Sequence, residues 1–215
     1  MNDTDTTNTT STVTTETDVD SERGPAAPAS GRWAGQPGRR AILVAATIGG
    51  AVSLSAGVYG RLHDPTNDTI TTFGFPTLIS MKAWLATGAA VLVLAQVATA
   101  MWMWGRLPRV SRPAPAWAVH GHRWLGTVAF LLTLPVAYHC LWSFGFQDSS
   151  ARVIAHGLLG CAFYGVFTTK MLLLRSERIP AQTLPVVGGL LAVILVAIWW
   201  TSSWWYFTTI GFPGV

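Results

Sequence analysis

Five long apolar runs alternate with short polar connectors from residue 41 onward. The runs cover about residues 41–60, 77–104, 119–143, 151–174 and 183–206. Each is close to the ~20 residues that a helix needs to cross the ~30 Å hydrocarbon core of a membrane. Each connector contains proline, glycine or charge, which interrupt helices. The pattern predicts an all-α integral membrane protein with five transmembrane helices in one antiparallel bundle.

The first 38 residues have a different character. They are rich in threonine, then in acidic residues, and then in glycine, proline, alanine and serine. Such a segment cannot bury enough apolar surface to offset the entropy lost on ordering. We therefore expect a disordered tail at residues 1–38 and a membrane domain at residues 39–215. We expect no cleavable signal peptide, because the first apolar run starts only at Ala41.

Composition agrees with a lipid environment. Half of the residues are hydrophobic and 11% are charged, whereas soluble domains carry about 25% charged residues. This composition excludes an ordinary soluble enzyme. The net charge of +4 comes from basic residues in short connectors, which favours membrane orientation over nucleic-acid binding.

The basic residues also predict an orientation. With the N-terminus inside, eleven of the 14 Lys and Arg residues lie on the inner side, as the positive-inside rule requires. The C-terminus is then outside. We expect a multi-pass protein of a bacterial cytoplasmic (inner) membrane, in which the bacterial source is an expectation from the resemblance given below.

Ionisable groups at membrane depth are functional candidates because they are costly to bury in lipid. His139 precedes the outer end of the third run by about five residues, and His156 follows the outer start of the fourth by about as many. At 1.5 Å per residue, both lie roughly 7–8 Å below the outer boundary. A histidine pair at one depth suits axial ligation of haem iron. The alternative is that both histidines serve packing or proton transfer.

Three further residues belong to the candidate site. Lys82, near the outer end of the second run, is expected either to extend to the headgroups or to contact haem propionates or an anionic substrate. Arg152 could do the same from the fourth run. His63, just after the first run, is either solvated or folded back onto the bundle.

The segments HRWLGTVAFLLTLPVAYHCLW and HGLLGCAFYGVF resemble the membrane cytochrome b561 and ferric-reductase-like haem bundles. More closely, segments across residues 77–207 resemble an uncharacterised family of small bacterial membrane proteins. That resemblance implies a redox context and a Rieske-type iron–sulfur protein as a partner. Cytochrome b561 proteins hold two haems through histidines on four helices, whereas here the runs contain only His122, His139 and His156.

The sequence therefore predicts a membrane electron-transfer protein with one haem b near the outer face. His139 and His156 are the expected metal ligands, and a quinol or a redox protein is the expected electron partner. A cofactor-free accessory or anchor subunit of a membrane redox complex is the alternative. A small permease is a third possibility, although the chain shows no inverted repeat.

Overall fold

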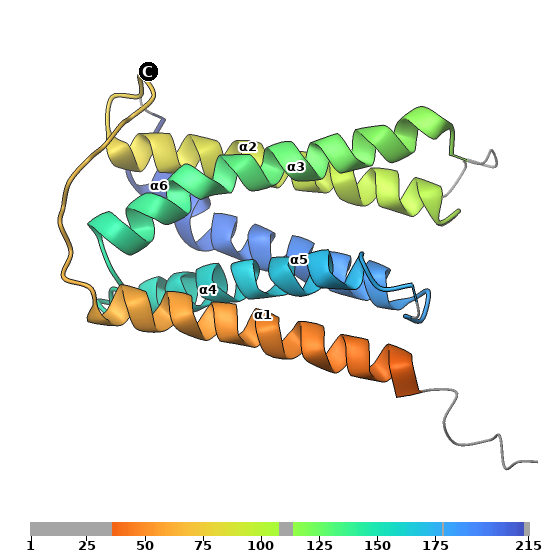
Figure 1. The fold of residues 1–215 in the computed structure, drawn as a ribbon. Coiled ribbons are helices and arrows are strands. Elements are labelled where there is room, and N and C mark those ends of the chain that lie inside the picture. The colour runs from red at the N-terminus through yellow and green to blue at the C-terminus, as the bar shows by residue number, and fades with distance from the viewer. Residues whose placement is uncertain (1–35, 108–113, 178, 213–215) are drawn as a thin grey trace, which may run out of the picture. The chain divides into compact units, whose positions relative to one another are not determined.

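A computed structural model describes residues 36–107, 114–177 and 179–212 of the chain. Within these ranges it contains helices and no strands. The elements are α1 (Gln36–Leu62), α2 (Leu78–Met103), α3 (Ala116–Tyr138), η1 (His139–Ser143), α4 (Ala151–Leu173), α5 (Thr183–Trp199), η2 (Trp200–Trp204) and α6 (Trp205–Thr209) (Figure 1). The predicted disordered tail covers residues 1–38, and residues 1–35 of it lie outside the part of the chain that the structure describes.

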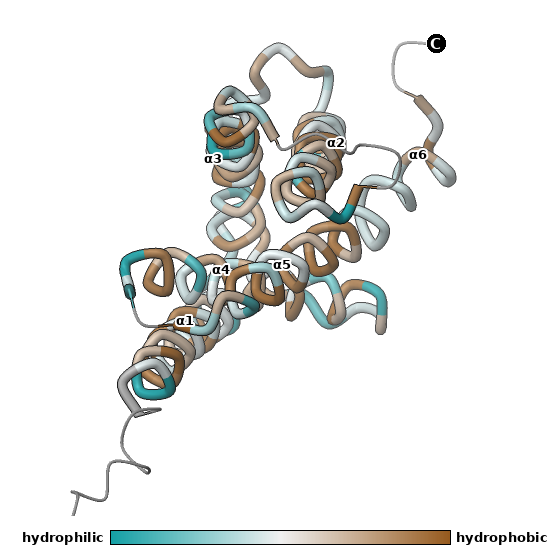
Figure 2. Tube along the Cα trace, turned by 90° about the vertical axis from the view of Figure 1, so that its right-hand side faces the viewer, coloured by the Kyte–Doolittle hydropathy of each residue, from teal (hydrophilic) through white to brown (hydrophobic). Residues whose placement is uncertain are grey.

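Five helical stretches are long and apolar enough to cross a membrane. This confirms the predicted number of spans within the described residues. The third stretch continues from α3 through the π-helical turn η1, and the fifth runs from α5 through η2 into α6. Apolar residues occur along every one of these helices (Figure 2).

The helices pack in pairs. α1 packs along α4 and α2 packs along α3, while α5 contacts both α4 and α2. Helices α3 and α4 approach each other mainly through large side chains. The Tyr164 hydroxyl donates a hydrogen bond to the Thr133 carbonyl oxygen at 3.1 Å, and the rings of Phe130 and Phe167 stack with centroids 4.0 Å apart.

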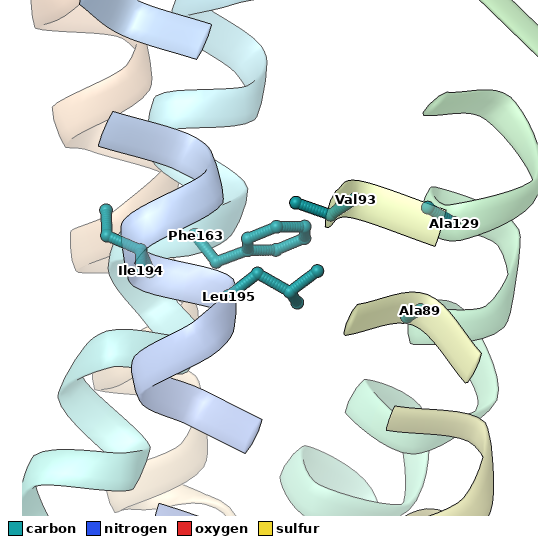
Figure 3. Close-up of a cluster of buried hydrophobic side chains, with 6 residues drawn as sticks. All are labelled: Ala89, Val93, Ala129, Phe163, Ile194 and Leu195. Carbon is teal, nitrogen blue, oxygen red and sulfur yellow. The ribbon is translucent and has the colours of Figure 1, made fainter. Parts of the chain in front are cut away.

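A small apolar core joins four of the helices. Phe163 of α4 and Leu195 of α5 point toward Val93 of α2 (Figure 3). Ala129 of α3 belongs to the same cluster and is also buried. Small residues on α2 and α3 allow these two helices to pack closely, so that the larger side chains fill the space toward α4 and α5.

Helices α1 and α4 approach even more closely, because glycine lies on both sides of their contact. A Cβ atom at Gly49 would overlap the carbonyl oxygen of Gly165, and a Cβ atom at Gly165 would overlap that of Gly49. The Ser53 hydroxyl donates to the Cys161 carbonyl oxygen across the same contact at 2.9 Å. Small residues with interhelical hydrogen bonds are typical of helix pairs in membranes. This contact fixes the position of α4, which carries two of the candidate site residues.

The regular helical geometry is broken where α3 and α5 end. Pro135 has no N–H group to donate within α3, and the π-helical turn η1 begins four residues later at His139. The second π-helical turn, η2, begins at Trp200 and includes Thr201. Such turns are rare in proteins, and those that occur are often at functional sites. Here both turns contribute residues to the same cavity.

Candidate functional site

A cavity of about 310 Å³ lies between α2, α3, α4 and the end of α5. This volume is at the lower end of the range for small-molecule sites. Its walls are mostly apolar side chains and glycines, and the core residues Phe163 and Leu195 also line it. The charged residues among its described lining are Lys82 and Arg152, both cationic. The other polar groups include those of Thr133, Cys140, Gln147, His156, Tyr164, Thr201, Ser202 and Tyr206.

His156 is held in the cavity by a hydrogen bond to η2. Its Nδ1 lies 3.1 Å from the Thr201 hydroxyl oxygen. That hydroxyl donates its own hydrogen to the carbonyl oxygens of Ala197 and Ile198, at 2.9 and 3.0 Å. Because a hydroxyl has one hydrogen, Thr201 accepts from His156, whose Nδ1 is therefore the protonated nitrogen. In the neutral imidazole, Nε2 then carries the lone pair and is the acceptor nitrogen.

Arg152 is anchored by the same residue. Its guanidinium donates to the Thr201 carbonyl oxygen at 2.6 Å and stacks on the Trp205 ring, with 4.0 Å between the guanidinium carbon and the ring centroid. Arg152 and His156 are four residues apart and so lie on one face of α4. The turn η2 thus orients both side chains of that face.

Lys82 reaches the cavity from α2. Its ammonium nitrogen lies 4.4 Å from the centroid of the Phe144 ring, a distance at which a cation is attracted to the aromatic face. The thiol of Cys140, on η1, interacts with both Lys82 and His156. An ammonium, an imidazole and a thiol therefore meet in one apolar chamber.

Phe146 forms another part of the wall. The connector between η1 and α4 carries Phe146 and is held to α1. The backbone N–H of Phe146 donates to the Gly60 carbonyl oxygen at 2.5 Å. Its ring packs against Gly157, where an added Cβ atom would lie 2.9 Å from a ring carbon. The missing side chain at Gly157 lets this aromatic ring lie against α4 next to His156.

His139, the other predicted haem ligand, is not among the residues that line this cavity. It is 1% exposed, and its Nδ1 donates to the Pro135 carbonyl oxygen at 2.8 Å. Its Nε2 is buried and has no partner among the described residues. The structure brings Lys82, Arg152 and His156 together, and places Cys140 on the cavity where His139 was expected.

His63 belongs to an aromatic stack away from the cavity lining. Its ring lies 5.0 Å from that of Tyr59 and 4.6 Å from that of Trp142, centroid to centroid. It has therefore folded back onto the bundle, which was one of its two predicted positions.

The residues present meet part of what haem ligation requires. Haem iron takes the lone pair of a neutral imidazole, and ligating histidines usually donate their other ring N–H to a neighbour. Both His139 and His156 have this arrangement. Of these two histidines only His156 lines the cavity, so the chamber would offer a haem iron one imidazole. A haem held between the two histidines stays a prediction.

Two site residues were missed by the sequence analysis. Cys140 was treated as a small apolar residue of its run, and Thr201 was not considered. A usable signal existed for Thr201, because Thr201, Ser202 and Ser203 are three consecutive hydroxyl residues inside an apolar run. Nothing comparable marks Cys140, whose role depends on which side of η1 it faces.

Comparison with known proteins places the chain in a family. The model of a family described as "Family of unknown function (DUF6529)" matches residues 42–214. The chain belongs to the DUF6529 family. No curated protein and no solved structure matches it. The expected membership of an uncharacterised family is confirmed, whereas the relation of this DUF6529 protein to cytochrome b561 stays a prediction.

Proposed function

We propose that this protein binds a quinone or quinol in the cavity and takes part in electron transfer within the membrane. One observation carries the proposal. A mostly apolar chamber combines hydrogen-bond donors on two cations with one imidazole acceptor, and no carboxylate is among its described lining residues. Small-molecule sites are of this kind, with apolar walls and a few polar groups that fix orientation.

The polar groups match the two redox forms of such a ligand. A quinone presents carbonyl oxygens, which accept hydrogen bonds from the Lys82 ammonium or the Arg152 guanidinium. A quinol presents hydroxyl groups, which donate to the Nε2 lone pair of His156. Because Thr201 occupies Nδ1, Nε2 is the nitrogen that takes up a proton when quinol is oxidised. The apolar walls suit the ring and the start of its isoprenoid tail.

The proposal extends to the setting of the site. The distribution of basic residues favours an N-terminus inside and a cavity near the outer face, in a bacterial cytoplasmic membrane. An electron partner at that face, such as a Rieske-type iron–sulfur protein, would complete the transfer. Co-purification of a redox protein with the tagged chain tests this part. The cofactor-free anchor subunit is favoured if such a complex forms but quinone does not bind.

The central experiment measures ligand stabilisation of the purified protein in detergent. A ligand that binds the folded state raises Tm. We expect decyl-ubiquinone to raise Tm and decylbenzene, which lacks the oxygen atoms, to leave it unchanged. Lys82→Met should reduce the shift. Lys170→Met is the matched control, because Lys170 lies in the last turn of α4 and does not line the cavity. Equal shifts with both compounds, or no shift with either, would contradict the proposal.

Haem binding is the second candidate, and the buried, unpartnered Nε2 atom of His139 favours it, with His156 as the other imidazole. Haem would supply one-electron transfer, and the two histidines would be its ligands. The visible spectrum of the purified protein tests this candidate. A Soret band that disappears in His156→Gln and in His139→Gln supports two-histidine ligation. Loss in His156→Gln alone supports one protein ligand, and a colourless folded protein excludes resident haem.

A further inference from the structure

The cavity contains a nucleophile next to a base. Cys140 lines the cavity from η1, and His156 lines it from α4. The thiol interacts with the His156 imidazole and with the Lys82 ammonium. A thiol becomes a strong nucleophile beside a base and a cation. The quinone contacts proposed above use Lys82 and His156 but leave the Cys140 thiol without a role.

The third member of the arrangement is Thr201. In many enzymes with covalent intermediates, the base beside the nucleophile is itself oriented by another group. Thr201 has that position here, because its hydroxyl accepts the Nδ1 proton of His156 at 3.1 Å. The nitrogen left to accept the thiol proton is Nε2. Cys140, His156 and Thr201 therefore form a sequence of nucleophile, base and orienting group.

The other cysteine provides an internal comparison. Cys161 also lines the cavity, but its sulfur lies toward α1, 3.8 Å from the position of a Cβ atom at Gly57. No described ammonium or imidazole interacts with its thiol. The two thiols of the chain thus differ in surroundings although both border one chamber.

We propose that Cys140 and His156 form a reactive thiol–imidazole pair that covalently captures α,β-unsaturated carbonyl compounds, including quinones with an unsubstituted ring carbon. The inference rests on the proposed function only in that such quinones are expected to enter the cavity. Its chemical class is broader, because any electrophilic alkene of suitable size meets the same thiol. Cys140 is then the site at which such compounds modify the protein.

The reaction needs no further oxidant or reductant. The sulfur electron pair forms an S–C bond to the alkene carbon, and the carbon–carbon π bond breaks. The thiol proton passes to Nε2 of His156 and from there to the ligand. With a quinone, the hydrogen of the attacked ring carbon also moves to an oxygen atom. The product is a hydroquinone thioether, in which one thiol and one quinone are fully accounted for.

Labelling rates of the purified full-length chain test the pair. In a Cys161→Ala protein, Cys140 is the remaining thiol; in a Cys140→Ala protein, Cys161 is. We expect N-ethylmaleimide and 1,4-benzoquinone to modify Cys140 at least about tenfold faster than Cys161 at pH 7, as followed by intact mass. General bases contribute about 10²-fold or more, so His156→Gln in the Cys161→Ala protein should slow labelling at least tenfold. His120→Gln, an exposed histidine of α3 outside the cavity lining, should not.

A second pair of variants separates the chemistry from folding defects. In the Cys161→Ala background, Thr201→Val should slow the labelling of Cys140 severalfold and Thr201→Ser should restore it, with Tm measured for each protein. Equal rates for Cys140 and Cys161, or an unchanged rate in folded His156→Gln protein, would overturn the inference. Decyl-ubiquinone, whose ring carbons are all substituted, distinguishes this inference from the proposed function. If Cys140 reacts rapidly and decyl-ubiquinone neither slows labelling nor raises Tm, the inference holds and the quinone site fails. If decyl-ubiquinone raises Tm and Cys140 reacts no faster than Cys161, the quinone site holds and the inference about Cys140 fails.

Discussion

The imidazole of His156 and the hydroxyl of Thr201 are joined by a hydrogen bond of 3.1 Å between α4 and the π-helical turn of α5. The Thr201 hydroxyl donates its hydrogen to carbonyl oxygens in the preceding turn of its own helix. In the bond between the two side chains, His156 is therefore the donor and Thr201 the acceptor. This bond leaves Nε2 as the nitrogen of His156 that is available to other groups of the cavity. The hydroxyl of Thr201 thus determines the tautomer of the neighbouring histidine.

Removing this hydroxyl should weaken quinone binding. A hydrogen bond of this kind contributes about 1 kcal/mol, which corresponds to roughly a fivefold change in Kd. We expect Thr201→Val to raise the Kd for decyl-ubiquinone by about that factor and Thr201→Ser to leave it nearly unchanged. Titration of the Tm shift with ligand concentration gives the Kd. If Thr201→Ser also raises the Kd for decyl-ubiquinone, the packing of the threonine methyl group matters instead.

Filling the cavity should abolish binding without unfolding the protein. Gly160 lines the cavity, and an added Cβ atom there meets nothing within 4 Å. The side chain of Gly160→Leu should therefore occupy ligand space at little cost in stability. Gly189→Leu is the matched control, since Gly189 is exposed on α5 and also has open space. We expect the quinone-dependent Tm shift to be lost in the first variant and kept in the second. If both variants keep the quinone-dependent Tm shift, the ligand binds elsewhere in the protein.

Neighbouring glycines of α1 should respond to alanine in opposite directions. A Cβ atom at Gly49 overlaps the backbone of α4, whereas one at Gly50 meets nothing within 4 Å. Overpacking typically costs about 1–3 kcal/mol, so Gly49→Ala should lower Tm. Gly50→Ala should raise Tm slightly, because alanine is favoured over glycine within a helix by about 0.5–1 kcal/mol. Similar Tm values for the two variants would mean that α1 and α4 are less closely packed than described.

The bond between Tyr164 and Thr133 should contribute modestly to stability. It links α4 to α3 next to the cavity, with the hydroxyl of Tyr164 donating. Hydrogen bonds between membrane helices average about 0.6 kcal/mol, so Tyr164→Phe should destabilise the protein by about that amount. Steric trapping or denaturant unfolding in detergent measures it. A change of several kcal/mol would indicate that the ring, rather than the hydroxyl, has moved.

The sequence predicted the spans well because each is long and apolar, and this signal does not depend on tertiary contacts. It also assigned Lys82, Arg152 and His156 to one end of the bundle, since depth follows from position along a helix. It did not predict the facing of His139 and Cys140. These are adjacent residues in a π-helical turn, where the 3.6-residue period fails. The irregular turn after Pro135 decides which of the two faces the cavity.

The pairing of helices has a consequence for ligand size. The close glycine contact joins α1 rigidly to α4, and α2 packs along α3, while α3 and α4 meet mainly through aromatic side chains. Backbone contacts resist separation, whereas side chains can change rotamer. The direct contact between α3 and α4 is therefore expected to yield more readily than the backbone contact between α1 and α4. We expect a bulkier ligand to widen the chamber at that contact by rotating Tyr164, which lines it, and to leave the four helices intact.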